Sequence, residues 1–142
     1  MTDTTSIHPN DSTVTTVTAP LWPTFVYRDA RAAIRFLETA FGFVERARYG
    51  DGDTIEHAEL AWPGGGGIML GSVREEMALR DLAPGSGSVY IAVDNADELY
   101  ERARAAGATI TRELRDEDYG SRGFTCRDPE GVYWSFGTYR GA

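Results

Sequence analysis

Apolar residues recur along this chain with two different periods, which predict strands and helices in a regular order. Residues 24–27 are an apolar and β-branched run that is typical of a short strand. The next apolar positions stand three to four residues apart, which predicts a helix that begins after a capping Asp29 and ends at Gly42. The apolar face of this helix consists of Ala33, Ile34, Leu37, Ala40 and Phe41.

The same strand and helix pattern returns further along the chain. Residues 89–93 predict a second strand, Asp94 occupies the capping position, and Gly107 follows the second helical stripe, formed by Ala96, Leu99, Ala103 and Ala106. The separation of the caps (94 − 29) and that of the two glycines (107 − 42) are both 65 positions. Matching caps, stripes and stops at one offset indicate a duplicated structural unit.

Three strand-like segments follow each predicted helix. Turns are predicted at Asp51-Gly52 and at the four glycines of residues 64–67. The expected strands are 43–49, 54–61 and 68–71 in the first unit, and 109–114, 123–127 and 133–139 in the second. Each unit therefore has the order strand, helix and three strands. Residues 75–82, between the units, predict one helical turn.

Composition and charge exclude several classes of function. The chain has 142 residues, of which 42% are hydrophobic and 25% charged, and these values suit an ordinary globular domain. Its net charge of −8 makes nucleic acid an unsuitable partner, because phosphate binding needs clustered lysine and arginine. No apolar run approaches the roughly 20 residues that cross a membrane. A cytoplasmic location is the default expectation.

The end of the chain contains its most informative stretch. Asp128-Pro129-Glu130-Gly131 predicts a tight turn, and Val132, Trp134 and Phe136 alternate with Tyr133, Ser135 and Gly137 on the strand that follows. This closing hairpin and the repeat resemble the glyoxalase/bleomycin-resistance/dioxygenase proteins, the vicinal-oxygen-chelate superfamily. The likeness is strongest to the metal-free members similar to bleomycin-resistance proteins.

The resemblance implies an α+β fold in which two tandem βαβββ modules form a curved mixed sheet around a cleft. The domain would span residues 21–140, with module one at 21–83 and module two at 86–140. Residues 1–20 are predicted to be a flexible tail. As an alternative, the β-branched stretch 13–18 could form a short arm strand that adds to a partner's sheet. A homodimer is expected, because members of the family complete or cover their open sheets with a partner.

Enzymes of this family hold one divalent metal with histidine and glutamate from four strand positions. Aligned on the two capping residues, these positions fall at Trp22, Glu59, Ser88 and Ser135 in this chain. Only Glu59 is a competent ligand, because indole does not coordinate a divalent metal and serine hydroxyls are weak donors. The sequence therefore predicts neither a metal centre nor any other cofactor.

Two alternatives to simple binding remain open. His57 and Glu59 share one face of a strand, so the protein could be a lyase or isomerase with an unusual metal site, or could use Glu59 as a general base. It could also be an accessory domain without a small ligand. Cys126 is expected to be a packed residue, because its strand offers no activating base.

The favoured hypothesis is a small-molecule binding protein with an aromatic, acidic cleft. The resemblance to bleomycin-resistance proteins makes the sequestering of an antibiotic one form of this function. Aromatic faces attract cations and flat rings, so a cationic or planar aromatic ligand is expected, with Glu59 facing a cationic group and Trp22 stacking. The predicted ligand-binding residues are Trp22, His57, Glu59, Ser88, Tyr90, Tyr119, Phe124, Tyr133 and Ser135.

Overall fold

The computed structural model describes residues 19–142, so the stretch 13–18 and nearly all of the predicted tail lie outside the described residues. In chain order the elements are β1 (Thr24–Tyr27), α1 (Ala30–Phe41), β2 (Val44–Asp51), β3 (Thr54–Ala61), β4 (Gly67–Ser72), β5 (Ser88–Ala92), α2 (Ala96–Ala105), β6 (Thr109–Asp116), β7 (Arg122–Arg127) and β8 (Tyr133–Gly137). Every predicted strand is present, with ends that differ from the prediction by at most two residues. The α+β class and the two βαβββ units are confirmed.

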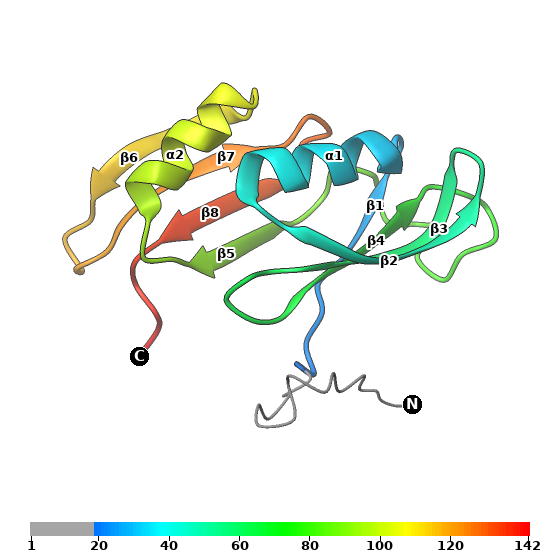
Figure 1. Ribbon diagram of the computed structural model, residues 1–142, viewed down its shortest axis with the longest axis horizontal. Helices are drawn as coiled ribbons and strands as arrows, with labels where there is room; N and C mark the ends of the chain where they lie inside the picture. Colours follow the sequence, from blue (N-terminus) through cyan, green and yellow to red (C-terminus); the bar gives the residue numbers. More distant parts are fainter. Residues whose placement is uncertain (1–18) are drawn as a thin grey trace, which may run out of the picture.

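The strands form two separate four-stranded sheets rather than one continuous curved sheet. The first sheet has the order β1-β4-β3-β2 and the second the order β5-β8-β7-β6. Each sheet is mixed: its first strand runs parallel to its neighbour, and the other pairs are antiparallel. Figure 1 shows the two sheets at opposite ends of the molecule. Among the described strands, β1 and β5 are therefore both edge strands.

The helix caps agree with the prediction in the first unit but not in the second. Asp29 caps α1 by accepting a 3.0 Å hydrogen bond from the Ala32 amide, and Gly42 ends the helix in the left-handed region at φ 91°. The expected cap at Asp94 is wrong, because Asn95 occupies the N-cap position of α2. Asp94 instead accepts a 2.6 Å hydrogen bond from Arg140.

The segment between the two units contains no helix. Residues 75–82 form bends and turns, with one hydrogen bond from the Leu82 amide to the Leu79 carbonyl at 2.9 Å. Leu79 is exposed, so this segment lacks the packed apolar face that stabilises a short helix. Within residues 19–142, no helix is long and apolar enough to cross a membrane.

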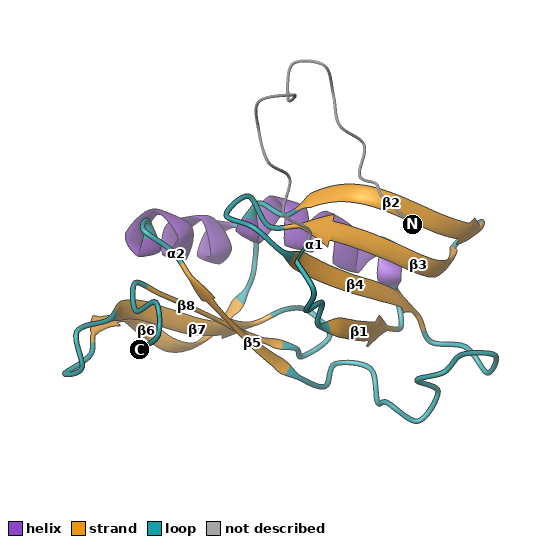
Figure 2. Cartoon of the chain, turned by 90° about the horizontal axis from the view of Figure 1, so that it is seen from below, coloured by secondary structure: helices purple, strands orange, loops and turns teal. Residues whose placement is uncertain are grey.

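One hydrophobic core joins the two units. Trp134 of β8 is fully buried, and its ring centre lies 5.5 Å from those of Phe25 and Phe41 and 5.6 Å from that of Phe43. The predicted inward face of Val132, Trp134 and Phe136 is thereby confirmed. In Figure 2 the two helices lie in one row, α2 over the strands of the second sheet and α1 behind those of the first.

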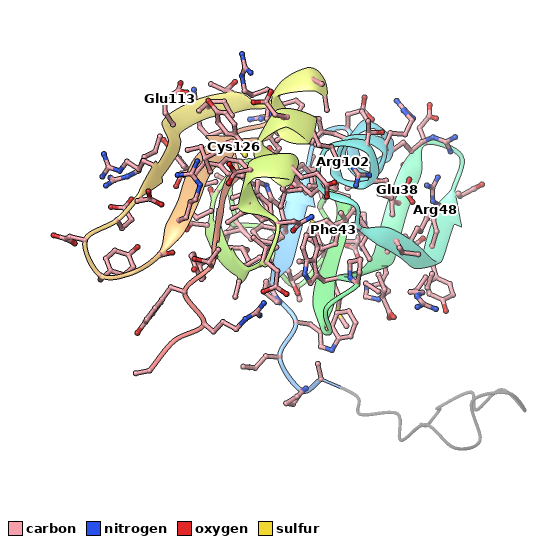
Figure 3. The ribbon with its side chains drawn as sticks, turned by 60° about the vertical axis from the view of Figure 1, so that its left-hand side comes forward. Glu38, Phe43, Arg48, Arg102, Glu113 and Cys126 are labelled. Carbon is pink, nitrogen blue, oxygen red and sulfur yellow. The ribbon has the colours of Figure 1, made fainter. Side chains whose placement is uncertain are left out.

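The second unit also holds both ends of α1. This helix has no acidic residue in its first turn and no basic residue in its last. The Glu130 carboxylate accepts the amides of Arg28 and Asp29 at 2.6 and 2.7 Å, just before the N-terminus of the helix. Arg102 of α2 donates to the Thr39 and Glu38 carbonyls at the other end; Figure 3 labels Arg102 and Glu38. Both charges complement the dipole of α1, so the two units stabilise one another electrostatically.

A buried carboxylate completes the junction. Asp128 Oδ1 accepts the amides of Glu130, Gly131 and Val132, which fixes the turn before β8. Asp128 Oδ2 accepts hydrogen bonds from the Tyr27 hydroxyl at 2.6 Å and from Trp134 Nε1 at 3.1 Å. Asp128 therefore links the first strand of one unit to the last strand of the other.

Candidate functional site

Each sheet turns one face toward the helices and the common core, and the opposite face, here called its open face, is available to a ligand. Successive residues of a strand point to opposite faces. On β3, Ala58 and Leu60 are buried in the core, so His57 and Glu59 lie on the open face of the first sheet. On β8, the burial of Trp134 likewise assigns Tyr133 and Ser135 to the open face of the second.

On the first sheet, His57 and Glu59 form a polar pair. His57 Nε2 lies 2.9 Å from Glu59 Oε2, so one imidazole nitrogen and one carboxylate oxygen already satisfy each other. The Tyr49 ring on β2 stacks on the imidazole with centroids 6.0 Å apart. The Glu59 side chain is 35% exposed, which leaves it open to water. The placement of the two residues on one face, predicted from their spacing, is present in the structure.

Trp22 lies beside the same sheet, just before β1. Its indole nitrogen donates a 2.7 Å hydrogen bond to the Ala19 carbonyl. A Cβ placed on Gly67 would come within 2.9 Å of the indole ring, so the glycine is what allows the ring to lie against β4. This packing fixes the position of Trp22, which remains half-buried.

On the second sheet, the predicted residues lie in two neighbouring cross-strand rows. One row places Ser88 of β5 beside Tyr133 of β8, and the next places Tyr90 beside Ser135. Ser135 Oγ is 2.9 Å from the Thr125 hydroxyl on β7. The four predicted residues therefore share one open face, which β5, β8 and β7 form.

A hollow of about 300 Å³ lies on this face, lined by Tyr90, Arg112, Glu117, Tyr119, Ser121, Gly123, Phe124, Thr125, Ser135, Phe136 and Gly137. Tyr90 donates a 2.6 Å hydrogen bond to the Tyr139 carbonyl. A Cβ on Gly137 would lie 2.7 Å from the Tyr90 hydroxyl and 2.9 Å from Ser121 Oγ, so this glycine makes room for both.

Two of the predicted residues play different parts. Tyr119, in the loop between β6 and β7, is exposed and packs edge-on against Tyr139 at 5.6 Å, at the rim of the hollow. Phe124 is only 3% exposed, and its ring stacks on Phe136 at 5.3 Å inside the core. Phe124 also lines the hollow, and its ring supports the hollow from the core side, so its contact with a ligand stays a prediction.

The arginines of this face were missed at the sequence level. Arg112 lines the hollow, and Arg127 on β7 lies on the same face as Thr125. The sequence contained a signal for Arg127, because successive strand residues point to opposite faces. Since Cys126 is buried, residues 125 and 127 point to the open face. The net charge of −8 describes the whole chain and does not indicate where individual arginines lie after folding.

A larger cavity of about 1040 Å³ lies between the two units. Its lining combines the turn before β4, the end of α1, the free edge of β5 and the start of α2. Among the predicted site residues only Tyr90 reaches it. Trp62 and Phe43 form its aromatic wall, with ring centres 5.1 Å apart. Neither cavity is lined both by the predicted site residues of the first sheet and by those of the second, so the predicted site is divided within one chain.

The family's four metal-ligand positions do not fit a metal here. Trp22 lies against Gly67, Ser135 is hydrogen-bonded to Thr125, and Glu59 contacts His57. Among the described residues, no group of three or more histidine, cysteine and acidic side chains gathers as a metal site would require.

Cys126 on β7, labelled in Figure 3, is completely buried. Burial, together with the neighbouring Asp128 carboxylate, raises the pKa of the thiol to about 12. A thiol held in its protonated form is a poor nucleophile, which agrees with the expected packing role.

Comparisons with known proteins identify relatives that are similar over most of this chain. An uncharacterised protein of Mycobacterium tuberculosis strain H37Rv, Rv0887c, is 31% identical over 133 residues, which are 89% of this chain and 78% of the relative. The crystal structure of TioX from Micromonospora sp. ML1 superposes with a TM-score of 0.74 at 31% identity, covering 86% of this chain and 99% of that one.

A more distant structure shows the same fold. The fosfomycin resistance protein FosX from Mesorhizobium loti superposes with a TM-score of 0.61 at 20% identity, covering 88% of this chain and 95% of that one. The model of the Glyoxalase/Bleomycin resistance protein/Dioxygenase superfamily matches residues 19–136. With its paired βαβββ units and closing hairpin, the chain belongs to this superfamily.

Proposed function

We propose that the protein binds a planar aromatic small molecule and holds it without chemical change. The observation that carries the proposal is the gathering of aromatic side chains on the open faces. Tyr90, Tyr119, Tyr133 and Tyr139 are 47%, 60%, 42% and 41% exposed on or beside the second sheet. Tyrosine offers a large, rigid contact surface at low entropic cost, and it suits the binding of flat rings. Sequestering an antibiotic is one form of this function, and a fosfomycin resistance protein shares the fold.

The predicted site residues lie on the open faces of two different sheets, and we expect a second copy of the chain to bring the two faces together. Trp22 lies beside the first sheet and Tyr90 on the second, and within residues 19–142 no strand pairs with the outer edge of β1 or of β5. We propose a homodimer in which the open face of the first sheet in one protomer meets that of the second sheet in its partner. Light scattering at micromolar concentration is expected to give twice the mass of one chain, and a monomer would contradict it.

Mixing two defective variants tests the shared cleft. The probe is 2-naphthol, a neutral planar ring, and its binding is followed by fluorescence. Trp22→Ala and Tyr90→Ala are each expected to weaken binding about tenfold, the loss of one stacking partner. If the cleft joins two protomers, a refolded mixture regains tight sites, because one cleft of each mixed dimer is intact.

The control for this experiment is Leu21→Ala. Leu21 precedes Trp22 and is 82% exposed, so its truncation is expected to leave binding and stability unchanged. If the mixture stays as weak as either variant alone, the cleft lies within one chain. Full binding of 2-naphthol by Trp22→Ala would remove the stacking role of this residue.

A second function is favoured by one contact, the 2.9 Å approach of His57 to Glu59. A carboxylate paired with an imidazole can accept a proton from a bound carbonyl compound and pass it on, which is the chemistry of an isomerase or lyase. Conversion of a carbonyl substrate that disappears in Glu59→Gln, with binding retained, would establish this function. Turnover that persists in Glu59→Gln would exclude it.

A further inference from the structure

The open face of the second sheet differs in charge from the protein as a whole. The chain carries a net charge of −8, yet among the residues that line the hollow Glu117 is the single carboxylate. That carboxylate accepts hydrogen bonds from two arginines, Arg112 at 3.3 Å and Arg115 at 3.0 Å. The guanidinium groups therefore neutralise this carboxylate, and the charges among the residues that line the hollow balance.

Arg127 adds one positive charge to this face. Within residues 19–142 no acidic side chain forms an ion pair with it. Its guanidinium carbon lies 5.9 Å from the centre of the Tyr133 ring, so the group lies beside an aromatic ring of this face. Its Nε is the one buried side-chain nitrogen or oxygen of the described chain that lacks a hydrogen-bond partner. The adjacent Asp128 forms no ion pair with Arg127, and its oxygens accept hydrogen bonds from Tyr27, Trp134 and the turn amides instead.

The register of the strands sets the distance between this charge and the tyrosines. Arg127 pairs with Tyr133, and the next row on the same face pairs Thr125 with Ser135. Same-face rows are two residues apart, or about 6.6 Å along a strand. Arg127 therefore lies one row from the hollow, a separation that a fused two-ring aromatic system spans.

Resting on the proposed small-molecule function, we propose that the ligand is a planar aromatic acid. Its rings lie against Tyr90 and Tyr133, and its carboxylate or other oxyanion binds the guanidinium of Arg127. The Thr125 and Ser135 hydroxyls, 2.9 Å apart, offer polar contacts between the two ends. Arginine binds carboxylates and other oxyanions through parallel hydrogen bonds, which gives both affinity and orientation. This ligand has the opposite charge to the cationic one that the composition favours.

Three probes with the same ring system test the charge preference: 2-naphthoate, 2-naphthamide and 2-naphthylmethylammonium. Their dissociation constants are measured on the full chain by calorimetry, and the binding face is identified by NMR. We expect 2-naphthoate to bind at least about tenfold more tightly than the neutral amide, a factor in keeping with one charge-assisted contact. In Arg127→Gln this difference is expected to vanish, and in Arg127→Lys part of it should return.

The matched control is Arg104→Gln, which makes the same change of charge on α2, where Arg104 is exposed and paired with Glu101. It is expected to keep the preference for the acid. Equal binding of acid and amide by the wild type, or tighter binding of the ammonium probe, would overturn the aromatic acid but leave small-molecule binding intact. Retention of the preference in Arg127→Gln would overturn the role of Arg127. Failure of all three probes at millimolar concentration would overturn the proposed function as well.

Discussion

Replacing Asp128 by asparagine tests the account of how the two units are joined. The substitution preserves the shape of the side chain and the oxygen that accepts the three turn amides. It also places an amide NH₂ opposite two donors, the Tyr27 hydroxyl at 2.6 Å and Trp134 Nε1 at 3.1 Å. The buried junction would then contain three donor groups at this point, of which only the Tyr27 hydroxyl can also accept.

The magnitude follows from these two hydrogen bonds. A hydrogen bond to a charged group contributes about 1.5–3 kcal/mol, so losing both would cost about 3–6 kcal/mol. The Tyr27 hydroxyl can rotate to accept from the new NH₂, and removing a buried charge recovers desolvation energy. We therefore expect a loss of about 2–4 kcal/mol, a large share of the 5–15 kcal/mol by which domains are typically stable.

Urea unfolding followed by fluorescence measures this loss directly, since Trp134 lies at the junction. Asp94→Asn is the matched control, because the Asp94 side chain is 91% exposed and its pair with Arg140 lies on the surface; we expect a change within about 0.5 kcal/mol. In a double-mutant cycle, Asp128→Asn should cost less on a Tyr27→Phe background. An Asp128→Asn variant as stable as the wild type would refute the linking role of the carboxylate.

Three further predictions concern the same framework. Replacing Arg102 by methionine removes the charge at the C-terminal end of α1 and should cost about 0.5–1 kcal/mol in urea unfolding; an unchanged midpoint would contradict this contact. Burial, with the Asp128 carboxylate beside the hydroxyl, raises the pKa of Tyr27 far above its usual 10.0. This stabilising contribution is therefore complete below pH 10 and declines as the pH rises further, because the unfolded chain then loses a proton that the folded chain retains. The free energy of unfolding should fall between pH 9 and pH 11, and less steeply in Tyr27→Phe; parallel curves would exclude Tyr27 as the cause. With its pKa raised to about 12, Cys126 should react with a thiol reagent at pH 8 only as fast as the chain opens. Rapid labelling of the folded protein would show that the sulfur is accessible.

Local patterns determined much of this fold from sequence alone. The strands, the helix from Ala30 to Phe41 and the turn at Asp128 each depend on periodicity or on a turn residue. The same-face placement of His57 and Glu59 follows from the period of a strand, which holds in any fold. The second cap was mispredicted, and Asp94 pairs instead with Arg140, 46 positions away, a contact that no local pattern records.

Only the tertiary structure decided what the open faces carry. The sequence placed Phe124 among the ligand contacts, and packing directs its ring into the core against Phe136. The division of the predicted site between two faces also depends on how the units pack, because a hydrophobic core is non-directional and a strand pattern does not specify which sheet lies opposite it. Arg112 and Arg127 come together because neighbouring strands place them on one face of an otherwise acidic protein. Net charge sums over the whole chain, whereas a ligand responds to the charges that folding brings together.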